Sequence, residues 1–271
     1  MKLAAVPYIN ALPLIYYLKE HPRLAPPAAL ERLLKIGEVD LATAPITTLL
    51  LNPEFRIVPG LAIGTRGPVQ SVRLILKKPG MALADVRSIY LDMESRTSVL
   101  LLKVLLRFKY NLDLDKIHFM TPVPAPDVDA VLLIGDKALD GSVGATLRGC
   151  PAPEGGHGEG GHIGPPLQYD LGQEWCSWTG LPFVFAAWIS PKKLIDTQII
   201  QDLTQARDRA LQDLGPILDT ITFLPRAAAE EYLKKNISYD LGKEEIAGIA
   251  RFHGYLKEMK IVTGDFQPRF F

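Results

Sequence analysis

Short apolar runs alternate with amphipathic stretches through the first two thirds of the chain. The apolar runs predict strands at residues 2–6, 39–44, 55–63, 71–77, 88–92, 129–134 and 183–189. Stretches with apolar residues three or four positions apart predict helices at 12–19, 28–37, 45–51 and 97–109. Because strands separated by helices favour parallel pairing, this order predicts an α/β fold built on parallel sheet.

The last third of the chain differs, because helical patterns are not followed there by further strands. Ser190 and Pro191 predict the start of a helix that runs to about residue 211. Two more helices are predicted at about 226–236 and 242–260. A helical tail has to pack on a layer that is already built, so we expect the chain to return to its first half after about residue 183.

These patterns together predict two lobes that are joined by two crossovers and enclose a cleft. The first lobe is expected to contain residues 1–76 and 187–271, and the second lobe residues 77–186. A stretch rich in Gly and Pro, 149–166, predicts a long loop in the second lobe.

Composition narrows the class of protein. The chain has 271 residues, of which 48% are hydrophobic, so a sizeable core is available. Lys plus Arg equals Asp plus Glu at 30 each, whereas nucleic-acid-binding proteins carry a basic excess. We therefore expect no nucleic-acid partner. No apolar run reaches the roughly 18 residues of a membrane span, so we expect no membrane partner either.

The N-terminal residues lack the long apolar segment of a secretory signal, because Pro7 and Asn10 interrupt a short apolar run. This favours a cytoplasmic protein. Two cysteines, Cys150 and Cys176, do not make a disulfide framework, and we interpret them as free thiols in a reducing compartment.

Polar side chains follow the first strand where a helix is about to begin. Tyr8 and Asn10 lie at this turn, and such turns bind ligands in α/β proteins because free N–H groups point there. Asn10 has two interpretations that can hold together. It can be the helix N-cap, or its amide can hold a hydroxyl or carboxylate of a substrate.

A second polar cluster precedes the helix at 97–109. Ser95, Arg96, Thr97 and Ser98 supply three hydroxyls and a guanidinium, which is more than one helix cap needs. A carboxylate would take backbone N–H and hydroxyl hydrogen bonds here. Arg96 either binds that ligand or forms an outward salt bridge.

Three further residues are weaker candidates. Thr43 lies at another strand-to-helix turn, where a β-branched strand residue is an equally good interpretation. Asp136 follows a buried strand, and Asp170 has the spacing of an N-cap with Gln173, so either could be an acid, a base or a cap. His157 and His162 in the Gly-rich stretch are a weak metal signal, and we expect no metal.

The sequence contains distinctive blocks at Val6–Leu14, Glu94–Val99, Leu133–Leu139, Tyr169–Gly172 and Thr179–Ala186, in chain order. Together these blocks resemble the chorismate dehydratase family of the futalosine route to menaquinone. The resemblance spans most of the chain. It departs at Pro7, where the family often has Ser or another polar residue, and in the long loop 149–166.

The resemblance implies a two-lobed fold like the type II periplasmic binding proteins, with a ligand cleft between the lobes. It also implies a lyase that removes water from chorismate to give 3-[(1-carboxyvinyl)oxy]benzoate without a metal or organic cofactor. Asn10 matches the family's catalytic Asn, and Ser95 to Ser98 match its serine-rich substrate loop. We expect Asn10 and Ser95 to be catalytic. The expected substrate-binding residues are Tyr8, Thr43, Arg96, Thr97, Ser98, Asp136 and Asp170.

Two other functions stay open at this point. The chain could be a binding protein for a small carboxylate, or the sibling lyase that forms a dihydroxynaphthoate later in the same route. The opening block and the Ser95–Ser98 block favour the dehydratase. The sequence also leaves open whether the chain forms a homo-oligomer.

Overall fold

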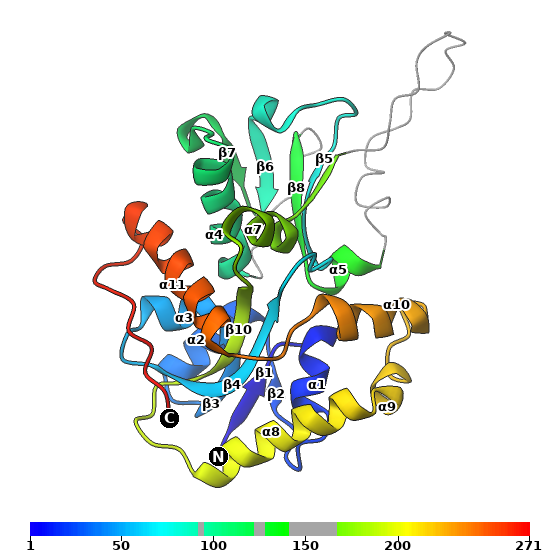
Figure 1. Cartoon of the computed structure of the whole chain (residues 1–271), viewed down its shortest axis with the longest axis vertical. Coiled ribbons are helices and arrows are strands. Elements are labelled where there is room, and N and C mark those ends of the chain that lie inside the picture. Colours follow the sequence, from blue (N-terminus) through cyan, green and yellow to red (C-terminus); the bar gives the residue numbers. More distant parts are fainter. Residues whose placement is uncertain (92–94, 122–127, 141–166) are drawn as a thin grey trace.

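The chain folds into two five-stranded sheets, one above the other, in a computed structural model that describes residues 1–91, 95–121, 128–140 and 167–271 (Figure 1). The first sheet has the order β2-β1-β3-β10-β4. Its strands are β1 (Leu3–Ala5), β2 (Arg23–Leu24), β3 (Leu41–Pro45), β4 (Arg56–Thr65) and β10 (Phe183–Ser190). Both termini lie on the side of this sheet (Figure 1).

The second sheet contains strands from the middle of the chain and has the order β7-β6-β8-β5-β9. These strands are β5 (Val72–Leu76), β6 (Ser88–Leu91), β7 (His118–Met120), β8 (Ala130–Ile134) and β9 (Gln168–Asp170). All the residues of β3 and β8, which lie inside their sheets, are buried. Strands of this kind have continuous apolar runs, as the sequence shows for both.

Both sheets contain the expected parallel pairs, but each sheet is mixed. β1 pairs in parallel with β2 and β3, and β6 pairs in parallel with β7 and β8. β10 runs antiparallel to β3 and β4, while β5 runs antiparallel to β8 and β9. The strands that break the parallel order, β5 and β10, are those that follow the crossovers, where the chain enters one sheet from the other.

Four helices lie close to their predicted positions, namely α1 (Leu12–Ile15), α2 (Pro27–Lys35), α3 (Ile46–Leu51) and α4 (Arg96–Val104). Two further helices, α5 (Asp136–Leu139) and α7 (Leu171–Thr179), follow β8 and β9. Short 3-10 helices lie at Ile9–Ala11 (η1), Leu83–Asp85 (η2) and Leu114–Lys116 (η4), and a short π-helix lies at Leu105–Lys109 (η3). α1 is shorter than predicted, because it ends at Ile15 and not at residue 19.

The C-terminal part is helical and packs on the first sheet, as expected. Its elements are α8 (Thr197–Gln212), α9 (Gly215–Leu218), α10 (Arg226–Glu231), η5 (Tyr232–Asn236) and α11 (Lys243–Glu258). α8 packs against α1 and β4, while α11 packs against β10 and α4.

The predicted start of the long helix at Ser190 is wrong. Ser190 ends β10, and its hydroxyl donates a hydrogen bond to the Asp40 carbonyl oxygen at 2.5 Å. The helix begins at Thr197, where the Asp196 carboxylate accepts a hydrogen bond from the Gln198 N–H at 2.9 Å. Ser190 stays in the strand because its side chain bonds to the residue that precedes β3, a neighbouring strand in the sheet.

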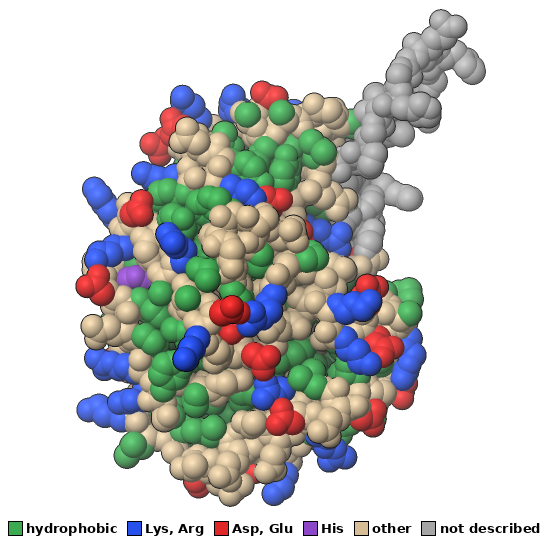
Figure 2. Space-filling model, in the orientation of Figure 1, with side chains coloured by type: hydrophobic (Ala, Val, Ile, Leu, Met, Phe, Trp, Pro, Cys, Tyr) green, Lys and Arg blue, Asp and Glu red, His purple; other side chains and the backbone are tan. Residues whose placement is uncertain are grey.

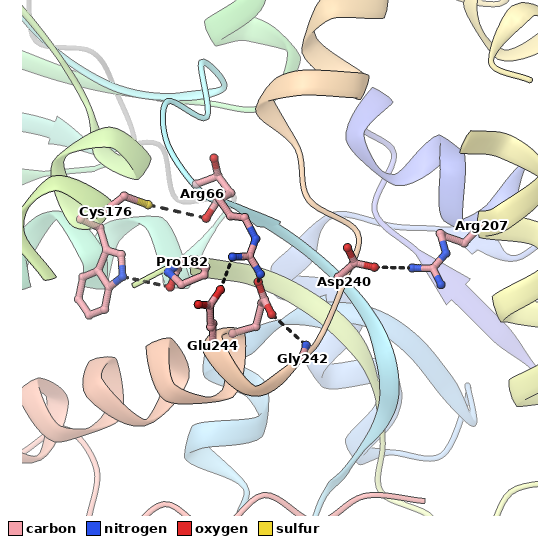
Figure 3. A network of polar contacts seen from close by, with 10 residues as sticks. Arg66, Cys176, Pro182, Arg207, Asp240, Gly242 and Glu244 are labelled. Atoms are coloured by element: carbon pink, nitrogen blue, oxygen red, sulfur yellow. Dashed lines mark hydrogen bonds and ion pairs between the residues drawn. The ribbon is translucent and has the colours of Figure 1, made fainter. Parts of the chain in front are cut away.

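Two crossovers connect the sheets, at residues 66–71 and 180–182. The Arg66 guanidinium in the first crossover pairs with Glu244 and Glu245 at the start of α11 (Figure 3). In the second crossover the Pro182 carbonyl oxygen accepts a hydrogen bond from the Trp175 indole N–H at 3.2 Å, and it lies against Gly248 of α11. The C-terminal helix therefore contacts both segments that join the two sheets.

The expected lobe boundaries stay a prediction, and sheet membership favours an earlier crossover in each case. β5 ends at residue 76 and was expected in the first lobe, yet it pairs with β8 and β9 of the second sheet. β10 begins at Phe183, before the expected boundary at 187, and lies entirely in the first sheet. The Gly-rich stretch 149–166, with Cys150, lies outside the described residues.

Candidate active site

A small cavity lies between the two sheets. Residues of both sheets and of the first crossover line it. The apolar lining includes Val6, Ile63, Val69, Val72, Ile134 and Phe185. The polar lining consists of Tyr8, Asn10, Ser71, Ser95 and Ser98. A mostly apolar cavity with a few convergent polar groups is typical of a small-molecule site.

Asn10 reaches the cavity from η1, the single turn of 3-10 helix that follows β1. The N-cap of this turn is Tyr8 and the N-cap of α1 is Ala11, so the interpretation of Asn10 as a helix cap is wrong. Its Oδ1 is buried and has no hydrogen-bond partner among the described residues. Because an unpaired buried amide oxygen is costly, this atom is a natural place for a donor on a ligand.

Ser95 and Ser98 form the opposite wall at the start of α4. Ser95 is the N-cap, and its Oγ accepts hydrogen bonds from the Ser98 N–H at 3.3 Å and from the Ser98 Oγ at 3.1 Å. Both side chains are buried and both line the cavity. The helix N-terminus places positive partial charge here, which suits a carboxylate.

Tyr8 and Asp136 connect the Asn10 turn to the second sheet. The Asp136 carboxylate accepts a hydrogen bond from the Ile9 N–H at 3.2 Å. A Cβ built on Gly135 would lie only 2.9 Å from the Tyr8 ring, so the ring lies directly on this glycine. Tyr8 and Gly135 line the cavity, whereas Asp136 is beside it.

Thr43 and Thr97 are not among the residues that line the cavity, although both were expected to bind substrate. The Thr43 Oγ1 accepts a hydrogen bond from the Val6 N–H at 3.2 Å, which fixes the end of β1. The Thr97 Oγ1 lies 3.1 Å from the Thr47 Oγ1 of α3. Both threonines are fully buried in contacts that hold neighbouring elements together.

Arg96 also does not line the cavity. Its side chain is 56% exposed and pairs with Glu31 of α2 at 3.2 Å. The geometry therefore favours the outward salt bridge, one of the two alternatives that the sequence leaves open. The pair joins a helix of the second sheet to a helix of the first.

Asp170 caps α7, as predicted, and also holds the first crossover. Its carboxylate accepts hydrogen bonds from the Gln173 N–H at 3.0 Å, the Val69 N–H at 2.9 Å and the Gln70 N–H at 2.6 Å. Val69 and the nearby Ser71 line the cavity, so Asp170 shapes the site through the crossover backbone.

Tyr232 is a neighbour of the site that the sequence did not predict. Its side chain is fully buried in η5, and burial raises its pKa far above the ordinary value of a tyrosine. Ser71 and Asn10 act on its hydroxyl by side-chain hydrogen bonding, which lowers that pKa in part. The phenol therefore stays neutral. No local signal marks Tyr232, because it lies in an ordinary helical pattern far along the chain from Asn10.

Glu94, the predicted loop at 149–166, His157 and His162 lie outside the described residues. Within the described ranges, no group of three His, Cys, Asp or Glu side chains is placed to hold a metal ion. Cys176 is a free thiol in this part of the chain, and burial raises its pKa to about 11. No helix in the described part combines the length and apolar character needed to cross a membrane.

Solved structures with the same arrangement define the class of protein. Protein AF1704 from Archaeoglobus fulgidus matches with a TM-score of 0.66 at 14% identity, over 96% of this chain and 98% of its own. The alkanesulfonate-binding protein SsuA from Xanthomonas axonopodis pv. citri, bound to MOPS, matches with a TM-score of 0.64 at 15% identity, over 97% and 94%. The periplasmic aliphatic sulphonate binding protein SsuA from Escherichia coli matches with a TM-score of 0.58 at 15% identity, over 100% of this chain and 93% of its own. The chain thus has the periplasmic-binding-protein-like fold, which confirms the predicted fold class.

Sequence comparison then gives the family. A family model described as menaquinone biosynthesis matches residues 1–258. Chorismate dehydratase from Thermus thermophilus is 32% identical over 222 residues, which is 78% of each chain. The chain belongs to the chorismate dehydratase family of menaquinone biosynthesis, and the resemblance seen in the sequence blocks is confirmed.

Proposed function

We propose that this protein dehydrates chorismate to 3-[(1-carboxyvinyl)oxy]benzoate, the lyase reaction of the futalosine route to menaquinone. The observation that carries the proposal is the unpaired, buried Oδ1 of Asn10 in a cavity shared by both sheets. The match to a menaquinone biosynthesis family along residues 1–258 supports the same reaction.

The substrate fits the two walls in chemical character. Chorismate has two carboxylates, and the start of α4 offers the Ser95 and Ser98 hydroxyls together with the helix N-terminus. We assign one carboxylate to this wall. The ring then lies against the apolar lining, and its hydroxyl donates a hydrogen bond to the Asn10 Oδ1.

The reaction removes the proton from ring C3 and the hydroxyl from ring C4. The electrons of the broken C3–H bond form the C3–C4 double bond, the C4–O bond breaks, and the hydroxide leaves with a proton as water. Because the ring becomes aromatic, orientation and a held leaving group supply much of what catalysis needs. The base in this proposal is the substrate's own enolpyruvyl carboxylate.

The remaining expectations stay predictions. They are a cytoplasmic location and a reaction without metal or organic cofactor, while the question of a homo-oligomer stays open. On the face shown in Figure 2, acidic and basic side chains are interspersed, in line with the equal numbers of the two kinds in the sequence.

Incubation of the purified protein with chorismate tests the proposal. We expect loss of chorismate and formation of the benzoate product, followed by chromatography and ultraviolet absorbance. Binding without turnover would instead identify a small-carboxylate binding protein. A chain that leaves chorismate unchanged but converts a cyclised futalosine derivative would be the sibling lyase. Either result would overturn the proposed reaction.

A further inference from the structure

The turn that carries Asn10 is held by a carboxylate that follows a strand of the other sheet. Asp136 begins α5, directly after β8 of the second sheet, while Ile9 belongs to η1 beside the first sheet. The Asp136 Oδ1 accepts the hydrogen bond of the Ile9 N–H at 3.2 Å. Ile9 immediately precedes Asn10, so this bond fixes the backbone from which the Asn10 side chain projects.

The contact is built into the turn at Gly135. Gly135 has a φ of +69°, which favours glycine, and a Cβ at this position would lie 2.9 Å from the Tyr8 ring. Its N–H donates to the Ser71 carbonyl oxygen at 2.8 Å. The backbone of the second sheet therefore approaches Tyr8 closely enough for Asp136 to reach Ile9.

We propose that Asp136 is a positioning residue, which orients Asn10 by holding the Ile9 N–H from the second sheet. The inference rests on the proposed dehydration of chorismate. It assigns Asp136 a different role from the substrate contact that its sequence position suggests. It also means that the Asn10 turn is complete only when both sheets are together.

The position of the carboxylate argues against direct contact with substrate. Gly135 lines the cavity and Asp136 does not. A carboxylate that faced a substrate with two carboxylates would also repel that substrate. In contact with the Ile9 N–H, the negative charge instead strengthens a hydrogen bond.

Two substitutions separate positioning from acid–base chemistry. Asp136→Ala removes the acceptor, and we expect kcat to fall about 10- to 100-fold, the range of a hydrogen bond to a charged group. Asp136→Asn keeps an acceptor oxygen, so we expect it to restore kcat to within a few-fold of wild type with KM little changed. If Asp136→Asn lost as much kcat as Asp136→Ala, the group would be acting through its proton and the proposal would be overturned.

Asp196→Ala is the matched control, because the Asp196 carboxylate also accepts a backbone N–H, at 2.9 Å, but at the start of α8 and away from the cavity. We expect Asp196→Ala to lower the thermal unfolding temperature and to leave kcat unchanged. A fall in kcat equal to that of Asp136→Ala would show that loss of any such bond has the same effect, against the proposal.

Amide hydrogen exchange of Ile9, measured by nuclear magnetic resonance, tests the contact without any assay of turnover. We expect exchange to be at least about ten-fold faster in Asp136→Ala and close to wild type in Asp136→Asn. Unchanged exchange in folded Asp136→Ala would overturn the proposal. If Asp136→Ala does not fold, the kcat and exchange of Asp136→Asn decide alone. If the wild-type protein did not convert chorismate but Asp136→Ala still exchanged Ile9 faster than wild type, the proposed function would be refuted and the Asp136–Ile9 contact would stand.

Discussion

The two walls of the cavity have similar local structure but differ in how their polar side chains are hydrogen-bonded. Each has a strand that leads into a helical turn with small polar side chains, β1 into η1 on one side and β6 toward α4 on the other. On the α4 wall, Ser95 and Ser98 hydrogen-bond to each other and to the helix backbone. On the η1 wall, the Asn10 Oδ1 is buried and has no partner among the described residues.

We propose that this difference separates a wall that binds the substrate from a wall that takes part in the reaction. The Ser95 and Ser98 side chains are fixed in place by the helix end, and the Ser95 O–H is still able to donate to a carboxylate. An amide oxygen left unpaired in a buried position is held at a cost that a ligand relieves. We therefore expect substitutions on the η1 wall to lower kcat, and substitutions on the α4 wall to raise KM.

Asn10→Ala should have the largest effect. Because it removes the group proposed to hold the leaving hydroxyl, kcat should fall by about 10²- to 10³-fold, the range seen when one polar group at a reacting centre is removed. Chorismate turnover under saturating substrate measures it.

Asn52→Ala is the control for this change. Asn52 is also buried, but its amide donates to the Thr48 carbonyl oxygen at 2.6 Å, away from the cavity lining. The Asn52→Ala variant should be less stable than wild type and have the same kcat. Normal turnover by Asn10→Ala would contradict the proposal that the η1 wall takes part in the reaction.

Ser95→Ala and Ser98→Ala should each raise KM about ten-fold, the effect of one lost hydrogen bond to a charged ligand. They should differ in stability. Ser95→Ala removes the N-cap acceptor and should cost about 1 kcal/mol of unfolding free energy, whereas Ser98→Ala keeps the cap. Steady-state kinetics and thermal unfolding measure the pair, and a fall in kcat with KM constant would place Ser95 among the reacting groups instead.

Thr97→Val should affect stability and leave KM close to wild type. The Thr97 Oγ1 accepts a hydrogen bond from the Thr47 N–H at 3.3 Å and lies outside the cavity lining. Its loss leaves a buried donor unpaired, at about 1–3 kcal/mol of unfolding free energy. Chemical denaturation measures the change. A KM that rises as much as in Ser98→Ala would return Thr97 to the binding wall.

Arg96→Ala and Glu31→Ala should have the smallest effects on KM. A partly exposed ion pair such as Arg96–Glu31 contributes about 0–1 kcal/mol, and salt weakens it further. Comparison of KM for the two variants at low and high salt sharpens the boundary of the α4 wall. A KM that rises strongly for Arg96→Ala alone would mean that the guanidinium reaches the substrate.

Much of the site could be predicted because its groups come from continuous motifs. The serine cluster has a capping pattern, and Asp170 has the spacing of an N-cap with Gln173, which the structure confirms. The wrong predictions have a common cause. Ser190 and Asn10 both have good local capping signals, and in both cases the surrounding fold decided the outcome.

The sequence by itself determined most of the strands and helices, the return of the helical tail to the first sheet and the residues of both polar walls, because periodicity and capping act over a few residues. Only the tertiary structure decided which polar groups face the cavity. Thr43 and Thr97 hydrogen-bond to a neighbouring backbone N–H and a neighbouring hydroxyl, respectively. Arg96 pairs with Glu31, and Asp136 accepts a hydrogen bond from the Ile9 N–H. A side chain's partner depends on which distant segment packs beside it, and that is fixed by the folding of the two sheets against each other.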